Sequence, residues 1–490
     1  MEQPIPQFYA GRSVLVTGAT GFMGKVLVEK LLRSCPQIGN VYIVIRSKRG
    51  QSAQERWDTI TKLVLFDRVK EEVPGNMEKV KVVDGDITMK KFGLSDACYE
   101  EMTNSVSIVF HVAASVRFVE SLDSAVQSNI IGTKNAVDFA LACNTMKAFV
   151  HVSTAYSNCY KEEIEEKFYP PLADWKTLVK IVENSDLNTL RILTAKYINP
   201  MVNTYTFTKQ LAETVVKDVE DRLPSVVLRP SIVICSWKEP VPGWIDNENG
   251  PIGLLIGIAK GAIRCQITDV NIRPDYMAVD IAIKAMIVAA WKKGTENGEG
   301  KLTTDIYNAS SMSKSITVGE TNNIGQELYK KYPMEQILWY PHVTFTKNLT
   351  VFRISCFYKH FLPALLVDSI LRVMNKKPML LKIQKKFLNA MLVLSYFTTR
   401  RWIIHNEKFL GLNKEVPASC LEDFDFNFEN IDVREFFKMG IIQGKRFILN
   451  EPIENLEKSR ANFNRFFWLD VFTKLAASAG FAYAMYSWLL

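Results

Sequence analysis

Short apolar runs recur along the N-terminal part of the chain, and stretches with helical spacing separate them. The runs are 14–16, 41–45, 80–83, 107–112 and 149–153. Runs of this length predict buried strands, whereas 25–33, 51–70 and the stretch that 129–133 opens predict helices. Strands that alternate with helices form parallel βαβ units with right-handed crossovers. The pattern therefore predicts an α/β fold built on a doubly wound parallel sheet.

The alternation stops at about Ser310, and helical stretches dominate from there. Residues 351–374 carry Phe, Leu, Val and Ile at helical spacing, and 387–397 form an apolar run between pairs of cations. A helix over 387–397 spans only about 16 Å, which is too short to cross a bilayer. Two readings stay open for this run: a buried helix of a second domain, or an interfacial helix anchored by the flanking cations.

The last segment, 475–490, carries no charge, and its apolar character extends back to Phe466 except at Asp470 and Lys474. The uncharged part alone is marginal for a membrane span, whereas 466–490 is long enough to anchor the chain. Its Gly, Ala and Ser content also suits a helix packed against protein. We expect membrane attachment through this tail.

Composition and charge narrow the class of protein. The 490 residues are 48% hydrophobic and 23% charged, as in globular chains, and the length predicts two or three domains. The net charge of +8 comes without an arginine-rich helix, so we expect anionic membranes and phosphate-bearing substrates as partners rather than nucleic acid. We expect no secretory signal, because the first residues have no apolar core.

The cysteines and histidines give no motif by spacing. No pair among the eight cysteines has the spacing of a redox or zinc motif, and the five histidines are dispersed. We therefore expect reduced cytosolic thiols and no metal site.

Glycines follow the first strand at Gly18, Gly21 and Gly24. A strand that runs into a glycine turn and then a helix is the first unit of a dinucleotide-binding fold, with the phosphates at the helix N-terminus. An NAD site carries an acid about twenty residues later, at the ribose 2′-hydroxyl. Arg46 fills this position, and its guanidinium suits a 2′-phosphate, so NADP is preferred. A solvated basic loop is the alternative.

Polar residues follow the later strands. Asp86 comes after the third strand, the small Ala113 after the fourth, and Ser153 and Thr154 after the fifth. The carboxyl edge of such a sheet is where ligands bind. Tyr205 and Lys209 lie four positions apart and project from one helix face.

In this combination the chain resembles the extended short-chain dehydrogenase/reductases, and more closely their alcohol-forming fatty acyl-CoA reductase branch, the male-sterility family. The resemblance covers nearly the whole chain. The stretches that carry it are TGATGFMGKVLVEKLLRSCP, FHVAASVRF, HVSTAYSNC, NTYTFTKQLAE, RPSIV with SWKEPVPGWIDNENGP, and NIDVREFF with GKRFILNE.

The resemblance implies roles for individual residues. The implied catalytic residues are Ser153, Thr154, Tyr205 and Lys209. The implied cofactor-binding residues are Thr17, Gly18, Thr20, Gly21, Phe22, Gly24, Arg46, Asp86, Ile87, Ala113, Asn129, Lys209, Arg229, Pro230 and Ser231. More residues separate Thr154 from Tyr205 along the sequence than in most sugar-nucleotide members of the superfamily. This long gap weakens the case for a sugar substrate.

The resemblance also implies an organisation of the chain. We expect a Rossmann reductase domain over 1–310, a helical domain over 311–460 and the tail over 466–490. Within the first domain, the segments 160–201 and 236–275 are expected to serve the acyl substrate, and the polar segment 160–201 is too long for a simple loop and is expected to cover the site.

The activity implied is reduction of long-chain fatty acyl-CoA to fatty alcohol through a bound aldehyde, with NADPH as cofactor and release of coenzyme A. We expect Lys209 to lower the pKa of Tyr205, because a neighbouring ammonium favours the phenolate. Alternatives are an aldehyde-forming reductase, a reductase of sterols or sugar nucleotides, and a scaffold that binds NADP without catalysis. We expect a membrane-associated protein whose catalytic domain faces the cytosol, at the endoplasmic reticulum, with peroxisome and lipid droplet as alternatives. Whether the chain forms a homodimer stays open.

Overall fold

The chain folds into two compact units, each assembled from separate stretches. The computed structural model describes residues 3–296, 302–452, 454 and 456–489. Unit 1 consists of Met1–Trp244, Asp275–Ser315 and Trp402–Ile431, and unit 2 of Ile245–Pro274, Ile316–Arg401 and Asp432–Leu490. From the sequence we expected each domain to be one continuous range of residues. The structure differs, because the periodicity of a sequence does not show which later segments fold back onto an earlier unit.

Unit 1 is built on a seven-stranded parallel sheet with the order β11-β7-β5-β4-β1-β2-β3. Its strands are β1 (Ser13–Thr17), β2 (Val41–Ile45), β3 (Val80–Asp84), β4 (Val106–His111), β5 (Ala148–Val152), β7 (Ser225–Pro230) and β11 (Asp305–Ala309). The order runs outward from β1 in both directions, and this reversal opens a crevice at the carboxyl ends of β1 and β4. The predicted doubly wound sheet is confirmed.

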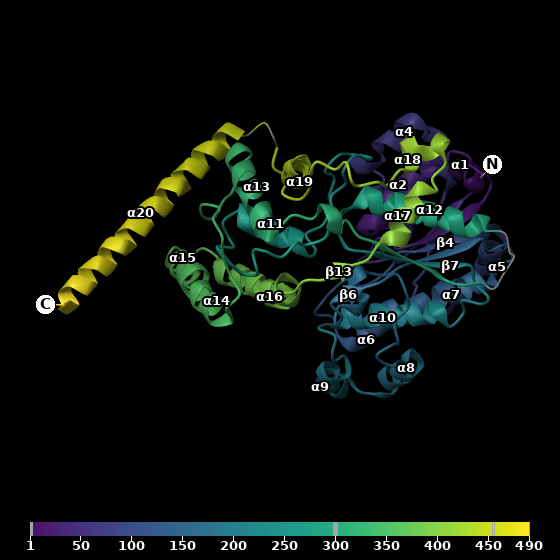
Figure 1. Cartoon of the computed structure of the whole chain (residues 1–490), viewed down its shortest axis with the longest axis horizontal. Coiled ribbons are helices and arrows are strands. Elements are labelled where there is room, and N and C mark those ends of the chain that lie inside the picture. The colour runs from purple at the N-terminus through teal and green to yellow at the C-terminus, as the bar shows by residue number, and fades with distance from the viewer. Residues whose placement is uncertain (1–2, 297–301, 453, 455, 490) are drawn as a thin grey trace. The chain divides into compact units, whose positions relative to one another are not determined.

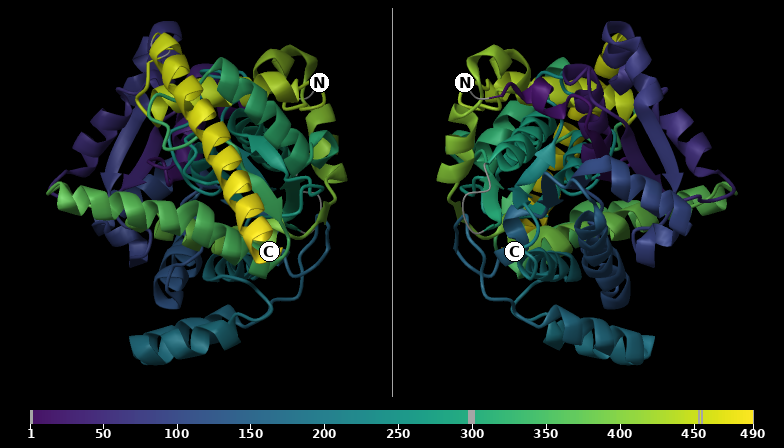
Figure 2. Two further views of the ribbon diagram at one scale, coloured as in Figure 1. Left: turned by 90° about the vertical axis from the view of Figure 1, so that its left-hand side faces the viewer. Right: turned by 90° about the vertical axis from the view of Figure 1, so that its right-hand side faces the viewer.

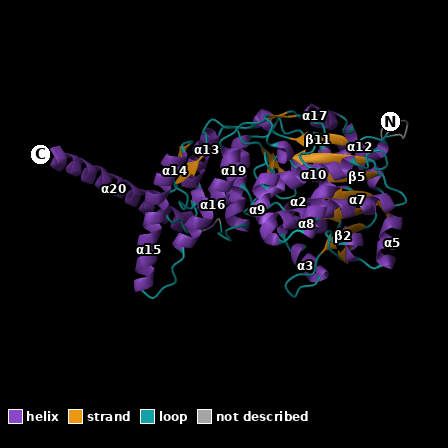
Figure 3. Ribbon diagram, turned by 90° about the horizontal axis from the view of Figure 1, so that it is seen from below, coloured by secondary structure: helices purple, strands orange, loops and turns teal. Residues whose placement is uncertain are grey.

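Helices cover both faces of this sheet. Figure 1 shows α2 and α12 above the strands and α7 and α10 below them, and Figure 3 shows the strands in orange among these helices. The α-helices of unit 1 are α1 (Ile5–Tyr9), α2 (Phe22–Ser34), α3 (Ala53–Ile60), α4 (Asp67–Glu72), α5 (Asp96–Ser105), α6 (Leu122–Ala125), α7 (Gly132–Ala142), α8 (Trp175–Asn184), α9 (Leu187–Tyr197), α10 (Thr204–Lys217), α12 (Val279–Thr295), α17 (Glu407–Lys414) and α18 (Leu421–Phe424).

Smaller elements complete unit 1. Two short parallel pairs join β8 (Ile232–Ile234) to β10 (Tyr276–Ala278), and β6 (Glu163–Ile164) to β13 (Ile403–Ile404). The 3₁₀ turns are η1 (Val64–Phe66), η2 (Pro74–Lys79), η3 (Lys90–Gly93), η5 (Ala155–Asn158), η6 (Met312–Lys314) and η8 (Ala418–Cys420), and η4 (Val126–Ile131) is a π-helix. The stretch 51–70, predicted as helical, is α3 followed by η1 and the start of α4.

Unit 2 is mainly helical. Its strands β9 (Cys265–Ile267) and β12 (Thr344–Thr346) form a parallel pair. Its helices are α11 (Pro251–Ala259), α13 (Val318–Lys331), α14 (Leu349–Cys356), the π-helix η7 (Phe357–Phe361), α15 (Leu362–Val373), α16 (Leu380–Thr398), α19 (Val433–Phe447) and α20 (Leu456–Leu489). Figure 2 shows α20, in yellow, as one continuous helix.

The apolar run 387–397 lies in α16. Phe387, Leu388 and Leu394 are partly buried and pack against the core of unit 2, whose centre includes Ile263 and Phe352. These contacts favour the buried-helix interpretation of this run over the interfacial one.

Candidate active site

The glycine turn after β1 holds the backbone too tightly for side chains. Gly18 has φ +75°, and a Cβ there would lie 2.7 Å from the backbone N of Ala113. At Gly24 a Cβ would lie 2.2 Å from the carbonyl O of Gly18. Gly21 is the N-cap of α2, and no side chain caps this helix. The backbone N–H groups at the start of α2 are therefore available to bind a negatively charged ligand.

Neighbouring residues support this turn. The Thr17 hydroxyl lies 2.9 Å from Nδ1 of His111 and accepts a long hydrogen bond from the Ala113 N–H at 3.4 Å. Phe22, the first residue of α2, stacks on Trp244 at 5.4 Å between ring centroids. Thr20 lies in the turn itself and is half-buried.

Arg46 and Asp86 lie together at the carboxyl ends of β2 and β3. Nη1 of Arg46 lies 3.3 Å from Oδ2 of Asp86, and the arginine side chain is 60% exposed. Burial raises the pKa of Asp86, but hydrogen bonds from Thr88 and the charge of Arg46 outweigh it and hold the pKa below its usual value. The Arg46 guanidinium therefore remains accessible to a ligand, and the Asp86 carboxylate orients it.

Asn129 connects two parts of the site. Its amide exchanges hydrogen bonds with the backbone of Ser115 and donates to the Thr208 hydroxyl on α10 at 2.9 Å. Asn129 lies in the π-helix η4, a rare conformation that is enriched at functional sites. The loop after β4 is thereby fixed to the helix that carries Tyr205.

Tyr205 and Lys209 lie on one face of α10, as predicted from their spacing. The Tyr205 phenol lies beside the Thr154 hydroxyl, which acts to lower its pKa, and its ring stacks on Phe118 at 5.7 Å. Nζ of Lys209 donates to the carbonyl O of Val152 at 2.6 Å. Strand β5 and helix α10 thus bring a phenol, a hydroxyl and an amine together at the carboxyl edge of the sheet.

The phenol is not acidified in the way that the sequence suggested. Burial raises the pKa of Tyr205 to about 12, although the neighbouring Thr154 hydroxyl opposes this shift. Burial lowers the pKa of Lys209 to about 8, against the charge of Glu213. The expectation that Lys209 lowers the pKa of Tyr205 is wrong for this structure, because desolvation of the phenol outweighs the other influences.

Ser153 and Arg229 are placed differently from the roles that the resemblance implied. The Ser153 hydroxyl donates to the Glu213 carboxylate at 2.5 Å. Arg229 is fully buried and donates from Nε and Nη2 to the same carboxylate, at 2.9 and 2.6 Å. The other Arg229 donors reach the backbone carbonyls of Glu165 and Lys167. These contacts make Arg229 a clamp for the segment after β6.

The remaining residues expected at the cofactor also hold the framework. The Ser231 N–H donates to the carbonyl O of Ala309 at 3.0 Å, directly after Pro230 ends β7. The carbonyl O of Ile87 accepts from the Asn135 amide at 2.8 Å.

Sequence reasoning missed Glu213, which accepts hydrogen bonds from Ser153, Ser157 and Arg229. The signal was present, since Glu213 follows Lys209 by four residues and so shares its helix face. It also missed the stacked pair His111 and His151, whose rings lie 5.5 Å apart beneath the site. Burial lowers the pKa of His111 to about 3 and that of His151 well below its usual value, so both are neutral.

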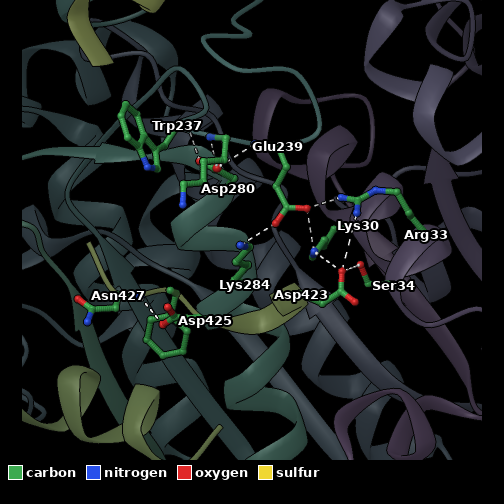
Figure 4. Close-up of polar contacts among 12 residues, drawn as sticks. Lys30, Arg33, Ser34, Trp237, Glu239, Asp280, Lys284, Asp423, Asp425 and Asn427 are labelled. Carbon is green, nitrogen blue, oxygen red and sulfur yellow. Dashed lines mark hydrogen bonds and ion pairs between the residues drawn. The ribbon is translucent and has the colours of Figure 1, made fainter. Parts of the chain in front are cut away.

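A buried ion network fixes the loop that carries Trp244. The Glu239 carboxylate accepts from Lys30 at 2.9 Å, Arg33 at 2.5 Å and Lys284 at 2.6 Å. Asp280 accepts from three successive backbone N–H groups, those of 237–239. Figure 4 shows the three cations pointing toward Glu239, with Asp423 beside Lys30 and Ser34. The network thereby holds one wall of the glycine turn in place.

The residues present fit a nicotinamide dinucleotide. The Cβ-free cradle at Gly18 and Gly24, the uncapped start of α2 and the crevice between β1 and β4 are the features that such a cofactor needs.

Comparisons of the sequence with known proteins also indicate a reductase. Family models described as male sterility protein match residues 16–286 and 359–451. Fatty acyl-CoA reductase 1 of Xenopus laevis and that of Homo sapiens are each 37% identical to the chain, covering 94% of it and 89% of each relative. Fatty acyl-CoA reductase wat of Drosophila melanogaster is 33% identical and covers 99% of the chain and 93% of that protein.

Solved structures show the same fold at low identity. The reductase domain of a non-ribosomal peptide synthetase from Mycobacterium tuberculosis has a TM-score of 0.59 at 16% identity, covering 92% of this chain and 94% of that one. The terminal R domain of the myxalamid pathway has a TM-score of 0.57 at 18% identity, covering 89% and 91%. These structures show the fold, and the family models with the sequence relatives show that the chain belongs to the male sterility family of fatty acyl-CoA reductases and is an oxidoreductase with a nicotinamide cofactor.

Proposed function

We propose that this protein reduces long-chain fatty acyl-CoA to a primary fatty alcohol with NADPH and releases coenzyme A. The observation that carries the proposal is the Tyr205 phenol beside the Thr154 hydroxyl, with Lys209 one helical turn behind the phenol. The relatives named fatty acyl-CoA reductase support the substrate class.

Four residues would hold the cofactor in this proposal. Gly18, Gly21 and Gly24 leave room for the pyrophosphate, and the exposed guanidinium of Arg46 supports the 2′-phosphate of NADP. The chemistry that a bound nicotinamide would supply here is hydride donation to the substrate.

Tyr205 and Thr154 would bind the carbonyl oxygen through their hydroxyl groups. Donors fixed before the reaction stabilise the negative charge that develops on this oxygen, and they do so strongly at a dry site. With its pKa near 12, Tyr205 stays protonated at neutral pH and can donate its proton. The substrate thiolate leaves without a covalent acyl-enzyme, because no protein nucleophile is needed to expel it.

Unit 2 offers a surface that suits the membrane in which long acyl chains dissolve. Among the described residues, one helix is long and apolar enough to cross a bilayer, Leu349–Val373, and an 18-residue window within it has a mean hydropathy of 1.3 and is 22% buried. It comprises α14, η7 and α15. The C-terminal helix α20, where the sequence placed the anchor, does not reach this hydropathy within its described residues.

The helix Leu349–Val373 has an unusual distribution of side chains. Its buried positions recur every four residues and include the polar His360 and Asp368, which face the protein. The large apolar residues that stay exposed, here called the apolar face, are Leu349, Val351, Ile354, Phe357, Tyr358, Leu365, Leu366, Val367, Ile370 and Val373. One side of the helix is held by the core of unit 2, so it would lie in the membrane interface rather than cross it.

Charge near the apolar face favours an anionic lipid surface. Arg353, Arg372, Lys376 and Lys377 are exposed on or next to this helix. Exposed apolar residues flanked by cations are typical of interfacial helices. The exposed aromatic residues of α20, among them Tyr483, Tyr486 and Trp488, would add a second contact through the tail. The endoplasmic reticulum remains the membrane that we propose, with peroxisome and lipid droplet as alternatives.

The experiment is a turnover assay with the purified full chain in detergent or liposomes. NADPH oxidation is followed at 340 nm against acyl-CoAs of increasing chain length, and lipid products are identified by mass spectrometry. Two NADPH consumed per acyl-CoA, with fatty alcohol as product, supports the proposal. One NADPH with aldehyde accumulating limits the enzyme to the first step, and turnover of a sterol or sugar nucleotide instead overturns the acyl-CoA substrate.

A further inference from the structure

Two cysteines and a histidine meet in the core of unit 2, although spacing in the sequence gave no sign of it. Cys265 lies on β9, Cys356 ends α14, and His360 lies in the π-helix η7. Sγ of Cys265 lies 3.4 Å from Sγ of Cys356 and 3.9 Å from Nε2 of His360. All three side chains are buried, with exposed fractions of 0%, 2% and 2%.

From this geometry we propose that Cys265 and Cys356 form a redox-active pair that closes into a disulfide between β9 and α14. The two sulfurs lie within hydrogen-bonding distance of each other, and either one can act as the donor. A bond needs only a short approach of the two sulfurs, which a disulfide holds about 2.05 Å apart. The proposal is independent of the reductase activity.

Electrostatics around Cys265 support the assignment of the nucleophile. The contact with Cys356 is the largest influence on the pKa of Cys265 and lowers it against the opposing effect of burial, and the cation Lys359 acts in the same direction. A thiolate is the reactive form of cysteine, and cations beside it are typical of reactive rather than structural cysteines. By contrast, burial raises the pKa of Cys235 in unit 1, so that thiol is inert.

The hydrogen bonds of His360 favour a thiol pair over a metal site. These three residues offer soft ligand atoms that all lie within 4.8 Å of one another, which also suits a zinc or copper ion. The lone pair on Nε2, however, already accepts the backbone N–H of Arg264 at 2.8 Å. Binding a metal through this atom would break that hydrogen bond in a buried site.

The oxidation that we propose uses a peroxide. The Cys265 thiolate attacks one peroxide oxygen, which gives a sulfenic acid and releases hydroxide. The Cys356 sulfur then attacks the sulfenic sulfur, forming the disulfide and releasing water, so two electrons pass from the thiols to the peroxide. Hydrogen peroxide is close to water in size and reaches buried thiols when the structure opens locally.

The test treats the purified full chain with increasing hydrogen peroxide and quenches it with an alkylating agent. We expect non-reducing peptide mapping to show a Cys265–Cys356 cross-link that dithiothreitol removes. Cys356→Ser should leave a sulfenic acid on Cys265 that dimedone traps, whereas Cys265→Ser should leave Cys356 reduced. Cys235→Ser is the matched control and should form the cross-link as the natural chain does.

Three results would overturn the proposal. They are absence of the cross-link at doses that oxidise other thiols, oxidation of Cys356 to the same extent in Cys265→Ser, and one equivalent of zinc or copper in the purified chain that both variants lose. Mapping of the natural chain needs no substitution, so the proposal stays testable even if a variant folds poorly.

Discussion

At the scale of single residues, the positions of the reactive groups were predictable, but their surroundings were not. The spacing of Tyr205 and Lys209 places them on one helix face in any α-helix, and the structure has them there. The burial that raises the pKa of Tyr205 depends on segments such as the Phe118 loop, which spacing does not reveal. The partners of Arg229 were hidden in the same way, because the Glu213 carboxylate comes from α10 and the two carbonyls come from the segment after β6.

Replacing Tyr205 with phenylalanine tests the proton donor. We expect Tyr205→Phe to lower kcat/KM about 10²- to 10⁴-fold, because it removes one donor to the developing oxyanion. NADPH affinity, measured by fluorescence titration, should stay within about twofold. Tyr99→Phe, which changes a tyrosine packed on Phe139 of α7, is the control. Full turnover by Tyr205→Phe would contradict the mechanism.

The pKa of Lys209 predicts an alkaline limit to activity. Because burial lowers this pKa to about 8, the free enzyme loses the ammonium as pH rises through that value. We expect kcat/KM, which reports the free enzyme, to fall above about pH 8, where this lysine loses its proton. Arginine keeps its charge at high pH, so the Lys209→Arg variant should lose this alkaline limb of the pH profile, the fall above about pH 8, even if its activity is lower. An unchanged limb in that variant would assign the titration to another group.

The same shift also affects folding. The unfolded chain, with a lysine pKa near its ordinary value of 10.5, binds more protons than the folded chain between about pH 8 and that value. Lys209 therefore lowers the free energy of unfolding below about pH 8, and this penalty fades as pH rises toward 10.5.

Arg46 tests the choice of cofactor. A guanidinium bound to a phosphate contributes about 1.5–3 kcal/mol, so Arg46→Ala should raise the KM for NADPH roughly 10- to 100-fold. The KM for NADH should change little, and Lys48→Ala, a nearby cation, serves as the control. Equal effects on both cofactors would show that Arg46 does not read the 2′-phosphate.

At the scale of elements, the strands followed their apolar runs closely, since a strand buried on both faces has no polar alternation to obscure it. The helices were harder to predict. The stretch 51–70 breaks into two short helices, and 129–133 straddles a π-helix and the start of α7. The ion network behind α2 was not foreseen at all, because its members come from α2, the loop before Trp244, α12 and α18.

Glu239 is the centre of that network and gives a stability prediction. Removing one partner of a buried ion pair leaves unpaired charge, so Glu239→Gln should lower the free energy of unfolding by about 3–5 kcal/mol in urea titrations. Asp96→Asn, which breaks an exposed pair with Lys91, should have little effect. Equal stability of the two variants would show that the network adds nothing.

Glu239 also predicts a dependence on pH. Burial raises its pKa, but the three cations outweigh burial and lower it to about 2. The carboxylate therefore stabilises the fold above the unfolded value, near 4.5, and this contribution is lost as pH falls from there toward 2. The loss of stability in acid should be smaller in Glu239→Gln than in the natural chain.

At the scale of the whole molecule, the sequence predicted an α/β part, a helical part and a membrane contact, but not which segments make each. Cys265 illustrates the reason, since its partner Cys356 lies far along the chain, and the packing of α14 on β9 and the pairing of β9 with β12 bring the two regions together. The membrane-facing surface was expected in the tail, whereas the helix Leu349–Val373 is the more apolar segment among the described residues.

The apolar face predicts how the protein meets lipid. Leu366→Glu and Ile370→Glu place a charge at exposed apolar positions, so each should weaken binding to liposomes with anionic headgroups about tenfold in flotation assays. Asn323→Glu on α13 adds the same charge elsewhere in unit 2 and should bind as the natural chain does. A chain ending at 470 separates the contribution of the tail. Undiminished binding by both α15 variants would leave the tail as the contact.

The interleaving of the two units has a consequence for how the protein is made. The backbone passes from one unit to the other five times, and Trp402–Ile431 returns to unit 1 after most of unit 2 has been synthesised. On the ribosome, the last strand of the main sheet, β11, emerges long before its neighbour α17, and β6 waits longer still for β13. The nascent chain therefore holds an incomplete unit 1 until Trp402–Ile431 has been synthesised, and cutting the gene at position 310 would leave neither half with all of its segments.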